Sequence, residues 1–385
     1  MRSTLLALIT VAALPFSSGA AAQENLPFSV EVTEDFHEPW ALAVMPDDRL
    51  LVTEAKGVVY VVTAEGKKTY RVRNTPDVAY AGQGGMGDVA LHPKFEKNGL
   101  IYLSYVEAGV GDTSGAAIMR AKLDETGARP KLVDKQIIWR QYPKMLGGGH
   151  FGHRMYFDNN GQLFITSGDR QKFTPAQDMQ SNVGKILRLN DDGSIPEDNP
   201  FVGYDSDDAF VDDGGVYDQI WSLGHRNPYG LAQDASGRLW EIEMGPAGGD
   251  ELNVIKRGAN YGYPLVSNGE HYDGRPIPNH DTRPEFEAPA IWWTPVISPG
   301  DLMVYRGWAF REWRGDALVA GLSSQAIIRL TLNADGTASE AERYDMGARI
   351  RGLAEASDGA LWVIEDEYGM SKGRLLKLTP QATAE

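Results

Sequence analysis

The stretch HRMYFDNNGQLFITSGD, residues 153–169, indicates the fold most clearly. Apolar and polar residues alternate before and after the segment Asp-Asn-Asn-Gly at 158–161. Alternation with a period of two on both sides of an Asn-Gly turn is the sequence signal of a β-hairpin. The stretch therefore predicts two antiparallel strands joined by a tight turn.

Five other stretches repeat this pattern, and they begin at Trp40, Met86, Tyr229, Asp301 and Ile350. A third apolar stretch often follows the hairpin, as in AIIRLTLN at 326–333. Six copies of four-strand size with variable loops predict an all-β fold, a six-bladed β-propeller of four-stranded antiparallel blades. The segment FSVEVTED at 28–35 is expected to close the ring by adding a strand to the last blade. A two-sheet sandwich fits six copies over this length poorly.

The first 22 residues have the order of a secretory signal peptide. Arg2 precedes an apolar run at 5–16, and small residues follow up to Ala22. We expect cleavage after Ala22, which leaves 23–385 as a single propeller catalytic domain. The apolar run is too short to span a bilayer comfortably, and no other segment is apolar enough to cross a membrane. The protein is therefore expected to be exported, to the periplasm in a Gram-negative source, without a membrane span.

The cysteine content and net charge limit the kinds of partner that the protein is expected to bind. The chain has no cysteine, so an exported protein of this sequence must be stabilised by its core, a metal or both. The net charge of −16 would become −17 without the leader, which argues against nucleic acid and anionic membrane partners. An acidic cluster at 205–213 is either a solvated loop or a surface calcium site. A monomer and a homodimer both remain open.

The segment GGGHFGHRM, residues 147–155, contains two of the seven histidines. His150 precedes a predicted strand, so it lies on a loop where the glycines allow a large planar ligand to approach. Histidine also has a pKa suited to a general base. A zinc pair with His153 is disfavoured because the triple glycine argues against a helix. Asp169, at the end of the same hairpin, either holds the imidazole in one tautomer or caps a turn.

Polar side chains also stand at the entries to other blades. Arg226 and Asn227 precede the fourth hairpin and offer donors to a carboxylate or carbonyl oxygen. Gln83 lies among glycines before the second hairpin, and Arg349 and Arg351 share one side of the strand that enters the sixth blade. Propeller loops converge on the central channel, so these residues are expected to face one cavity. Two inward arginines without an obvious acidic partner favour an anionic ligand.

The fourth hairpin ends in EMGPAGGDEL, residues 243–252. Gly245 and Pro246 cannot easily continue a strand ladder, so their carbonyls are free to face a hard cation. Asp250 and Glu251 add acid nearby, and calcium prefers oxygen ligands. An anionic, planar, oxygen-rich cofactor together with a divalent cation would satisfy this cavity.

At these residues the chain resembles the soluble PQQ-dependent sugar dehydrogenases, and the aldose sugar dehydrogenase branch more than the soluble glucose dehydrogenases. The motifs are EPWALAV at Glu38, GQGGMGDVALHPKF at Gly82, GGGHFGHRMYF at Gly147, SLGHRNPYGLA at Ser222, GPAGGDELNVIKRGANYGYP at Gly245 and RIRGLA at Arg349. They follow the order of the family and cover nearly the whole mature chain.

The resemblance implies an oxidoreductase that converts aldoses to lactones and passes electrons to an unidentified acceptor. His150 matches the base that takes the proton of the sugar C1 hydroxyl as hydride passes to PQQ. Asp169 matches the carboxylate that orients this base, and Arg226 the arginine that stabilises the reduced quinone oxygen. The positions that match cofactor-binding residues are Gln83, His150, Arg226, Asn227, Arg349 and Arg351.

The resemblance also implies two calcium sites. Gly245 and Pro246 match the carbonyls that bind the active-site calcium, and Glu251 and Tyr261 match a second, structural site. The chain departs from the glucose dehydrogenase pattern at four places. These are Gly149 in place of an acid, Met244 in place of an amide, His153 in place of a small residue, and Ser323, Ser324 and Gln325 where the fifth blade should carry a lysine.

Two other functions stay open at this point. One is a calcium-dependent propeller hydrolase of the lactonase type, which would also use a channel cation and a histidine. The other is a propeller that binds a sugar or a protein without turnover, which the missing lysine counterpart favours. Binding of PQQ separates the dehydrogenase from both.

Overall fold

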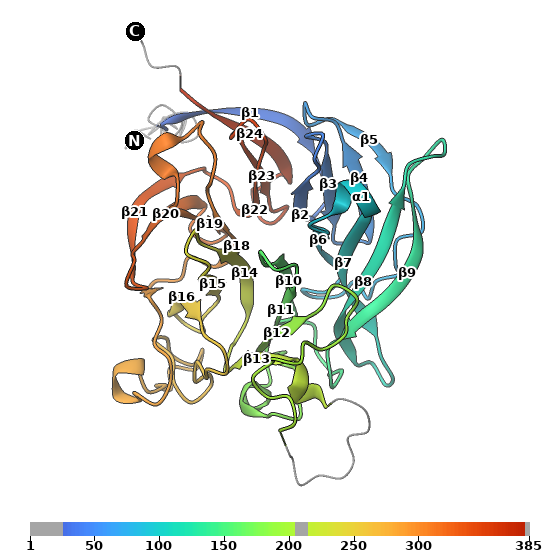
Figure 1. The fold of residues 1–385 in the computed structure, drawn as a ribbon. Helices are drawn as coiled ribbons and strands as arrows, with labels where there is room; N and C mark the ends of the chain where they lie inside the picture. Colours follow the sequence, from blue (N-terminus) through green and yellow to red (C-terminus); the bar gives the residue numbers. More distant parts are fainter. Residues whose placement is uncertain (1–25, 205–214, 382–385) are drawn as a thin grey trace, which may run out of the picture.

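Six four-stranded antiparallel sheets surround a central axis in the computed structural model (Figure 1). The structure describes residues 26–204 and 215–381. The predicted six-bladed propeller is confirmed. The predicted leader at 1–22 and the acidic cluster at 205–213 lie outside the described residues.

In the first three blades, the strands run in chain order from the innermost outward. Blade 1 consists of β2 (Pro39–Val44), β3 (Leu50–Glu54), β4 (Val58–Val62) and β5 (Lys68–Arg71). Blade 2 consists of β6 (Met86–Leu91), β7 (Leu100–Ala108), β8 (Ser114–Asp124) and β9 (Lys131–Arg140). Blade 3 consists of β10 (Gly152–Phe157), β11 (Leu163–Ser167), β12 (Lys185–Leu189) and β13 (Ile220–Leu223).

The other three blades are also ordered from the innermost strand outward, and the last one takes its outermost strand from the start of the chain. Blade 4 consists of β14 (Pro228–Gln233), β15 (Leu239–Glu243), β16 (Asp250–Ile255) and β17 (Ile291–Trp293). Blade 5 consists of β18 (Pro299–Val304), β19 (Ala317–Gly321), β20 (Ala326–Leu332) and β21 (Ala338–Asp345). Blade 6 consists of β22 (Ile350–Glu355), β23 (Leu361–Glu365), β24 (Arg374–Pro380) and β1 (Phe28–Asp35).

Helix is scarce in the described part of the chain. It is limited to α1 (Phe95–Asn98) and to 3₁₀ turns at Thr174–Gln177, Val216–Gln219, His280–Thr282 and Arg311–Trp313.

The turn between β10 and β11 forms as its sequence predicts. The Asp158 carboxylate accepts hydrogen bonds from the backbone N–H of Asn160 at 2.9 Å and of Gln162 at 2.8 Å. Gly161 has a φ of 82°, a conformation that glycine adopts without steric cost. This local chemistry explains why the hairpin could be identified from sequence.

The ring closes as predicted, because β1 pairs antiparallel with β24 and Phe28 lies opposite Pro380. The first and last described strands therefore belong to one sheet. The repeat pattern indicates no third strand for blade 4, whereas the structure has β16 there. The acidic residues Asp250 and Glu251 open this strand and are buried in it, which hides the apolar pattern.

Each pair of neighbouring blades buries a separate apolar cluster, and these clusters differ in size. The interface between blades 5 and 6 buries sixteen apolar residues, with Phe28, Phe310, Trp313 and Tyr344 in mutual contact. The interface between blades 3 and 4 buries only six: Phe164, Ile186, Leu231, Leu239, Ile255 and Tyr261. Polar groups fill much of the remaining space there.

Arg154, on β10, joins the innermost strands at the centre of the ring. Its guanidinium lies 4.3 Å from the ring of Trp40 on β2. It forms an ion pair with Asp88 at 3.2 Å and donates to the carbonyls of Tyr229 at 2.9 Å, Gly300 at 2.6 Å and Arg351 at 3.3 Å. One buried side chain therefore contacts the innermost strand of every other blade, which fixes the loops at the strand ends relative to one another.

Candidate active site

Two cavities lie at the end of the propeller where the innermost strands begin. The larger, of about 440 Å³, is lined by Gln83, Arg349 and Arg351 among others. The smaller, of about 260 Å³, is lined by His150 and other residues that include Asp169 and Arg226. The predicted site residues therefore divide between two cavities rather than facing one.

Gln83 links the two cavities. Its side-chain oxygen accepts the backbone N–H of His150 at 2.7 Å. Asn227, in contrast, is fully buried and is among the lining residues of neither cavity. Its Oδ1 has no hydrogen-bond partner among the described residues. The prediction that Asn227 faces the cavity is therefore not borne out in this arrangement.

His150 sits at the end of its glycine-rich loop in a left-handed conformation, with a φ of 49°. Its Nδ1 lies 2.6 Å from Oδ1 of Asp169, which leaves Nε2 as the ring nitrogen free to act on a ligand. Burial lowers the pKa of His150 below its usual value, and the hydrogen bond to Asp169 opposes that shift. The imidazole is therefore neutral at neutral pH and able to accept a proton.

The position of Asp169 is fixed by a tight turn. Its carboxylate accepts the backbone N–H of Gln171 at 3.0 Å and of Phe173 at 3.2 Å. Its own N–H donates to the carbonyl of Arg226 at 2.7 Å. Three non-glycine residues of this turn, Arg170, Gln171 and Phe173, have positive φ. Such conformations cost energy and cluster at functional sites.

Arg170 holds the loop that carries His150, and the sequence did not predict this role. Its Nε donates to the carbonyl of Gly149 at 2.9 Å, Nη1 donates to that of Ser114 at 2.7 Å, and Nη2 to that of Gly147. The guanidinium lies 3.8 Å from the ring centre of Phe151. Burial lowers the pKa of Arg170 to about 10, so the side chain keeps its charge. Its place directly after Asp169 was the available signal.

Gly149 has a steric explanation. A Cβ added there would lie 2.5 Å from the carboxamide of Gln171, which lines the smaller cavity. Gln171 thus occupies the space into which a side chain at 149 would project. The chain therefore has no side chain at the position before His150. Gln171, from the other end of the hairpin, fills that space.

His153 does not join His150 in a metal pair. Its Nδ1 lies 2.8 Å from the Ser104 hydroxyl and its ring stacks on Trp40, with ring centres 4.9 Å apart. Burial lowers the pKa of His153 to about 3, so it stays neutral. Its role is to pack between blades.

Arg226 lies on the loop before β14 and lines the smaller cavity. Its Nη1 donates to the carbonyls of Met244 at 2.9 Å and Gly245 at 2.5 Å. Its Nη2 donates to the Tyr272 hydroxyl at 3.2 Å. Its Nε is buried and has no partner among the described residues. A buried donor without a partner favours an anionic or carbonyl-bearing ligand beside it.

Tyr272 and Tyr263 are further residues that sequence reasoning missed. Both line the smaller cavity, and the Arg226 guanidinium lies 5.7 Å from the ring centre of Tyr272 and 6.0 Å from that of Tyr263. They belong to a long irregular connection after β16, which has no repeat pattern to place it.

The four residues predicted to bind calcium come together. Gly245, Pro246, Glu251 and Tyr261 all line one small cavity of about 10 Å³, room for a single ion or water. The Gly245 carbonyl accepts the Arg226 guanidinium, so a cation there requires this arginine to turn away. Glu251 Oε1 lies 3.4 Å from Nε2 of His280.

The expectation that Arg349 and Arg351 have no acidic partner is wrong. Asp366 lies 2.9 Å from Nε of Arg349 and 3.2 Å from Nη2 of Arg351. This aspartate follows β23, the strand paired with β22, so the sheet register brings it beside both arginines. Nε of Arg351 is nevertheless buried without a partner among the described residues. The pair thus keeps donor capacity for an anion although its charge is partly compensated.

The fifth-blade lysine has no substitute at the larger cavity. Ser323 donates its hydroxyl to the carbonyl of Val296, and Gln325 has a φ of 52° in the turn before β20. Among the described residues, no lysine lines either cavity.

Within the same residues, no helix is long and apolar enough to cross a membrane.

The chain is similar in sequence to known sugar dehydrogenases. The family model described as glucose/sorbosone dehydrogenase matches residues 36–377. The aldose sugar dehydrogenase of Escherichia coli K12 is 36% identical over 361 residues, which cover 92% of this chain and 93% of that protein. Quinoprotein glucose dehydrogenase B of Acinetobacter calcoaceticus is 30% identical over 305 residues, 72% of this chain and 60% of that protein.

Solved structures agree with this result. The soluble aldose sugar dehydrogenase of Escherichia coli, in its apo form, superposes with a TM-score of 0.82 at 35% identity, over 92% of this chain and 100% of that one. The PQQ-bound aldose sugar dehydrogenase of Streptomyces coelicolor superposes with a TM-score of 0.74 at 28% identity, over 91% and 98%.

Proposed function

The chain belongs to the glucose/sorbosone dehydrogenase family, and from this premise we propose that it oxidises the C1 hydroxyl of aldose sugars to lactones with PQQ and calcium. The observation that carries the proposal is the buried His150–Asp169 pair, 2.6 Å apart, beside Arg226 in one cavity. The relative from Streptomyces coelicolor is described as PQQ-bound, which supports the choice of cofactor.

The residues present fit an anionic, oxygen-rich cofactor. Arg226 and Arg351 each keep a buried Nε without a partner among the described residues, and Gln83 connects their two cavities. Gly245 and Pro246 would offer carbonyl oxygens to calcium, and Glu251 with Tyr261 would hold a second ion. When bound, PQQ accepts the hydride from the sugar C1, and calcium polarises the cofactor as a Lewis acid.

The chain's own residues supply the proton chemistry. Asp169 accepts the Nδ1 proton of His150, so Nε2 presents its lone pair to the C1 hydroxyl and takes the proton as the C1 hydrogen leaves with its electron pair. Arg226 would offer its unpartnered Nε to an oxygen atom that gains negative charge, while its Nη groups donate to Met244, Gly245 and Tyr272. Burial of His150 keeps its imidazole neutral before the reaction.

The remaining parts of the proposal concern location and partners. The leader at 1–22 supports export to the periplasm, and the electron acceptor is a separate redox partner. The loop that carries Tyr272 lines the cavity of His150, so we assign sugar preference to this loop.

The test is a titration of metal-free apoprotein with calcium and stoichiometric PQQ, followed by glucose and a phenazine or indophenol dye. The expected result is bleaching of the cofactor by sugar and steady dye reduction that His150→Ala slows by ~10²–10⁴. Binding of PQQ without reduction by any aldose would contradict the substrate class. Absence of PQQ binding in the presence of calcium would overturn the dehydrogenase and favour the lactonase or the binding propeller.

A further inference from the structure

A layer of buried polar residues lies on the blade 3 side of blade 4. On β15, Leu239 packs in the small cluster between these blades, and Glu241 and Glu243 follow at intervals of two, on the same side of the strand. On β16, Asn253 lies opposite Glu241 and Glu251 lies opposite Glu243. The apolar residues between them, Trp240, Ile242 and Leu252, face blade 5 instead.

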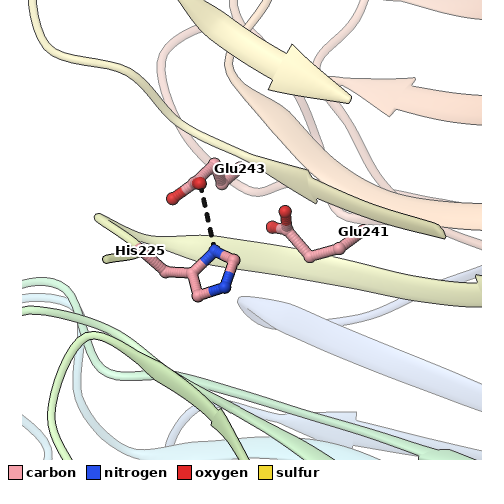
Figure 2. A group of neighbouring side chains, drawn as sticks. All are labelled: His225, Glu241 and Glu243. Atoms are coloured by element: carbon pink, nitrogen blue, oxygen red, sulfur yellow. Dashed lines mark hydrogen bonds and ion pairs between the residues drawn. The ribbon is translucent and has the colours of Figure 1, made fainter. Parts of the chain in front are cut away.

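His225, from the loop before β14, completes this layer. Glu241 and His225 are fully buried and Glu243 is 3% exposed. One ligand-capable atom of each lies within 4.8 Å of the others. Figure 2 shows the Glu241 carboxylate turned toward Glu243 and the imidazole. Two acids and a histidine thus converge in a place where blades normally pack apolar side chains.

The outer atoms of these side chains are already held by the protein. Nε2 of His225 lies 2.9 Å from the Ser222 hydroxyl. Oε2 of Glu243 accepts the backbone N–H of Arg226 at 2.6 Å. Nδ1 of His225 and Oε1 of Glu243 therefore face each other, at 3.3 Å. Orientation of a ligating histidine by a hydrogen bond to its other nitrogen is the usual arrangement around a metal.

Two further buried oxygens complete the ligand set. Oε1 of Glu241 and Oδ1 of Asn253 have no hydrogen-bond partner among the described residues. Asn253 is anchored beside both acids, because its Nδ2 donates to Oε2 of Glu241 at 3.1 Å and to Oε1 of Glu243 at 3.4 Å. In the tautomer that carries its proton on Nε2 and donates it to the Ser222 hydroxyl, Nδ1 of His225 and Oε1 of Glu243 are two acceptors that face each other. One cation would satisfy both of them together with the two unpartnered oxygens.

Charge leads to the same conclusion. Within the described residues, no lysine or arginine side chain forms an ion pair with Glu241 or Glu243. Arg226 reaches Glu243 only through its backbone. Buried carboxylates without a counter-charge are costly, and a bound cation removes that cost.

We propose that Glu241, Glu243 and His225 bind a first-row divalent cation such as zinc, with Asn253 as an oxygen ligand after rotation of its amide. The imidazole favours such an ion over calcium, which takes oxygen ligands. A tetrahedral ion with bonds of about 2.1 Å holds its ligand atoms about 3.4 Å apart, so atoms that lie within 4.8 Å of one another need to approach by at most about 1.4 Å.

This site adjoins the predicted calcium cavity, because Glu243 lines that cavity too, and it does not depend on the proposed function. It uses none of the four residues Gly245, Pro246, Glu251 and Tyr261. Its role would be structural, because Glu243 also accepts the N–H groups of Arg226 and Asn227 and so joins the ion to the loop of the cofactor arginine. A cation here compensates for the thin apolar packing between blades 3 and 4.

The test compares the full-length wild type with Glu241→Gln, which keeps the side-chain size and removes the charge. Both are stripped with EDTA, returned to buffer with calcium in excess, and titrated with zinc by calorimetry and thermal melting. Wild type should bind one more zinc than Glu241→Gln, and its melting midpoint should rise by roughly 5 °C at a hundredfold excess over Kd. Without zinc, Glu241→Gln should be at least as stable as wild type, because it removes one of two like charges.

Two controls make the result specific. Glu65→Gln, at an exposed turn, should bind zinc like wild type, and Glu251→Gln should keep the zinc and lose only the predicted calcium. Equal zinc stoichiometry in wild type and Glu241→Gln would overturn the proposal. If Glu241→Gln does not fold, anomalous diffraction at the zinc edge from zinc-soaked wild-type crystals tests whether the ion binds here. A peak between His225, Glu241 and Glu243 supports the site, and no peak there overturns it.

Discussion

The interface between blades 3 and 4 and the interface between blades 5 and 6 have the same strand pattern but different contents. Between blades 5 and 6, Trp313 stacks on Phe310 with ring centres 4.2 Å apart and on Tyr344 at 5.2 Å. Between blades 3 and 4, the apolar cluster has six buried residues, and His225, Glu241 and Glu243 occupy the adjacent space.

The difference shows where this propeller places its chemistry. The aromatic interface is stabilised by the burial of apolar area, and this free energy depends little on the direction in which each side chain points. The polar interface depends on directed contacts, such as those of Arg226 and Asp169 across the blade boundary. Changes in the first region should therefore alter stability, and changes in the second should alter activity.

The largest expected effect is on activity, in the polar region. His150→Ala should lower kcat by ~10²–10⁴, because the general base is lost. Its melting midpoint should stay close to that of wild type, since the side chain contacts Asp169 and few apolar groups. Steady-state dye reduction with PQQ and calcium, together with thermal melts, measures both. A variant that melts much earlier but retains kcat would break the comparison.

The reciprocal change lies in the aromatic region. Trp313→Ala should reduce the free energy of unfolding by about 3–5 kcal/mol, because it leaves a large cavity between Phe28, Phe310 and Tyr344. Chemical denaturation measures the loss. Below the unfolding transition, kcat per folded molecule should match that of wild type, and a large fall in kcat would contradict the division between the two regions.

A smaller effect on activity is expected at the loop of the base. Arg170→Met removes the donors to the carbonyls of Gly147 and Gly149 and so loosens the segment that carries His150. We expect kcat to fall by roughly tenfold to a hundredfold, as for a misplacement of about 1 Å. PQQ affinity should change little, which a titration of cofactor absorbance checks. Arg170→Lys is the control, and an equal loss in both variants would point to the fork of donors rather than to charge.

The smallest change concerns pH. Because burial lowers the pKa of His150, its imidazole is neutral above that pKa and gains a proton as pH falls through it. The acid limb of kcat/KM should therefore lie below about pH 6.5. Comparing the histidine NMR titrations of wild type and His150→Ala identifies the group. A His150 midpoint above about 6.5 would show that Asp169 outweighs desolvation.

Much of the architecture could be predicted because it is local. The hairpin of β10 and β11 depends on a turn in which Asp158 binds N–H groups two and four residues ahead. The closing strand β1 was identifiable from its alternation. In contrast, β16 was hidden, since its buried acids Asp250 and Glu251 do not follow the apolar pattern of the other blades.

The candidate site was predictable in part. His150 and Asp169 flank one hairpin and lie 19 residues apart in sequence, so the pairing of Gly152 with Ser167 brings their segments close, and the turn after β11 then directs the carboxylate. The partner of Arg349 and Arg351 was missed, although Asp366 follows the strand that pairs with theirs, and a register argument would have found it. The role of Arg170 depends on the path of the glycine loop, which spacing does not define.

By itself, the sequence determined six hairpin blades and the closing strand, because these features follow from local pattern and hairpin pairing, and it left Asp169 open between the pairing with His150 and a turn cap. Only the tertiary structure decided how the blade entries meet. It separates Gln83 and His150 into adjacent cavities across 67 residues of sequence, and it links Arg154 to Arg351 across 197. The physical reason is that closing the ring fixes the distances between loops of different blades, and no local pattern records those distances.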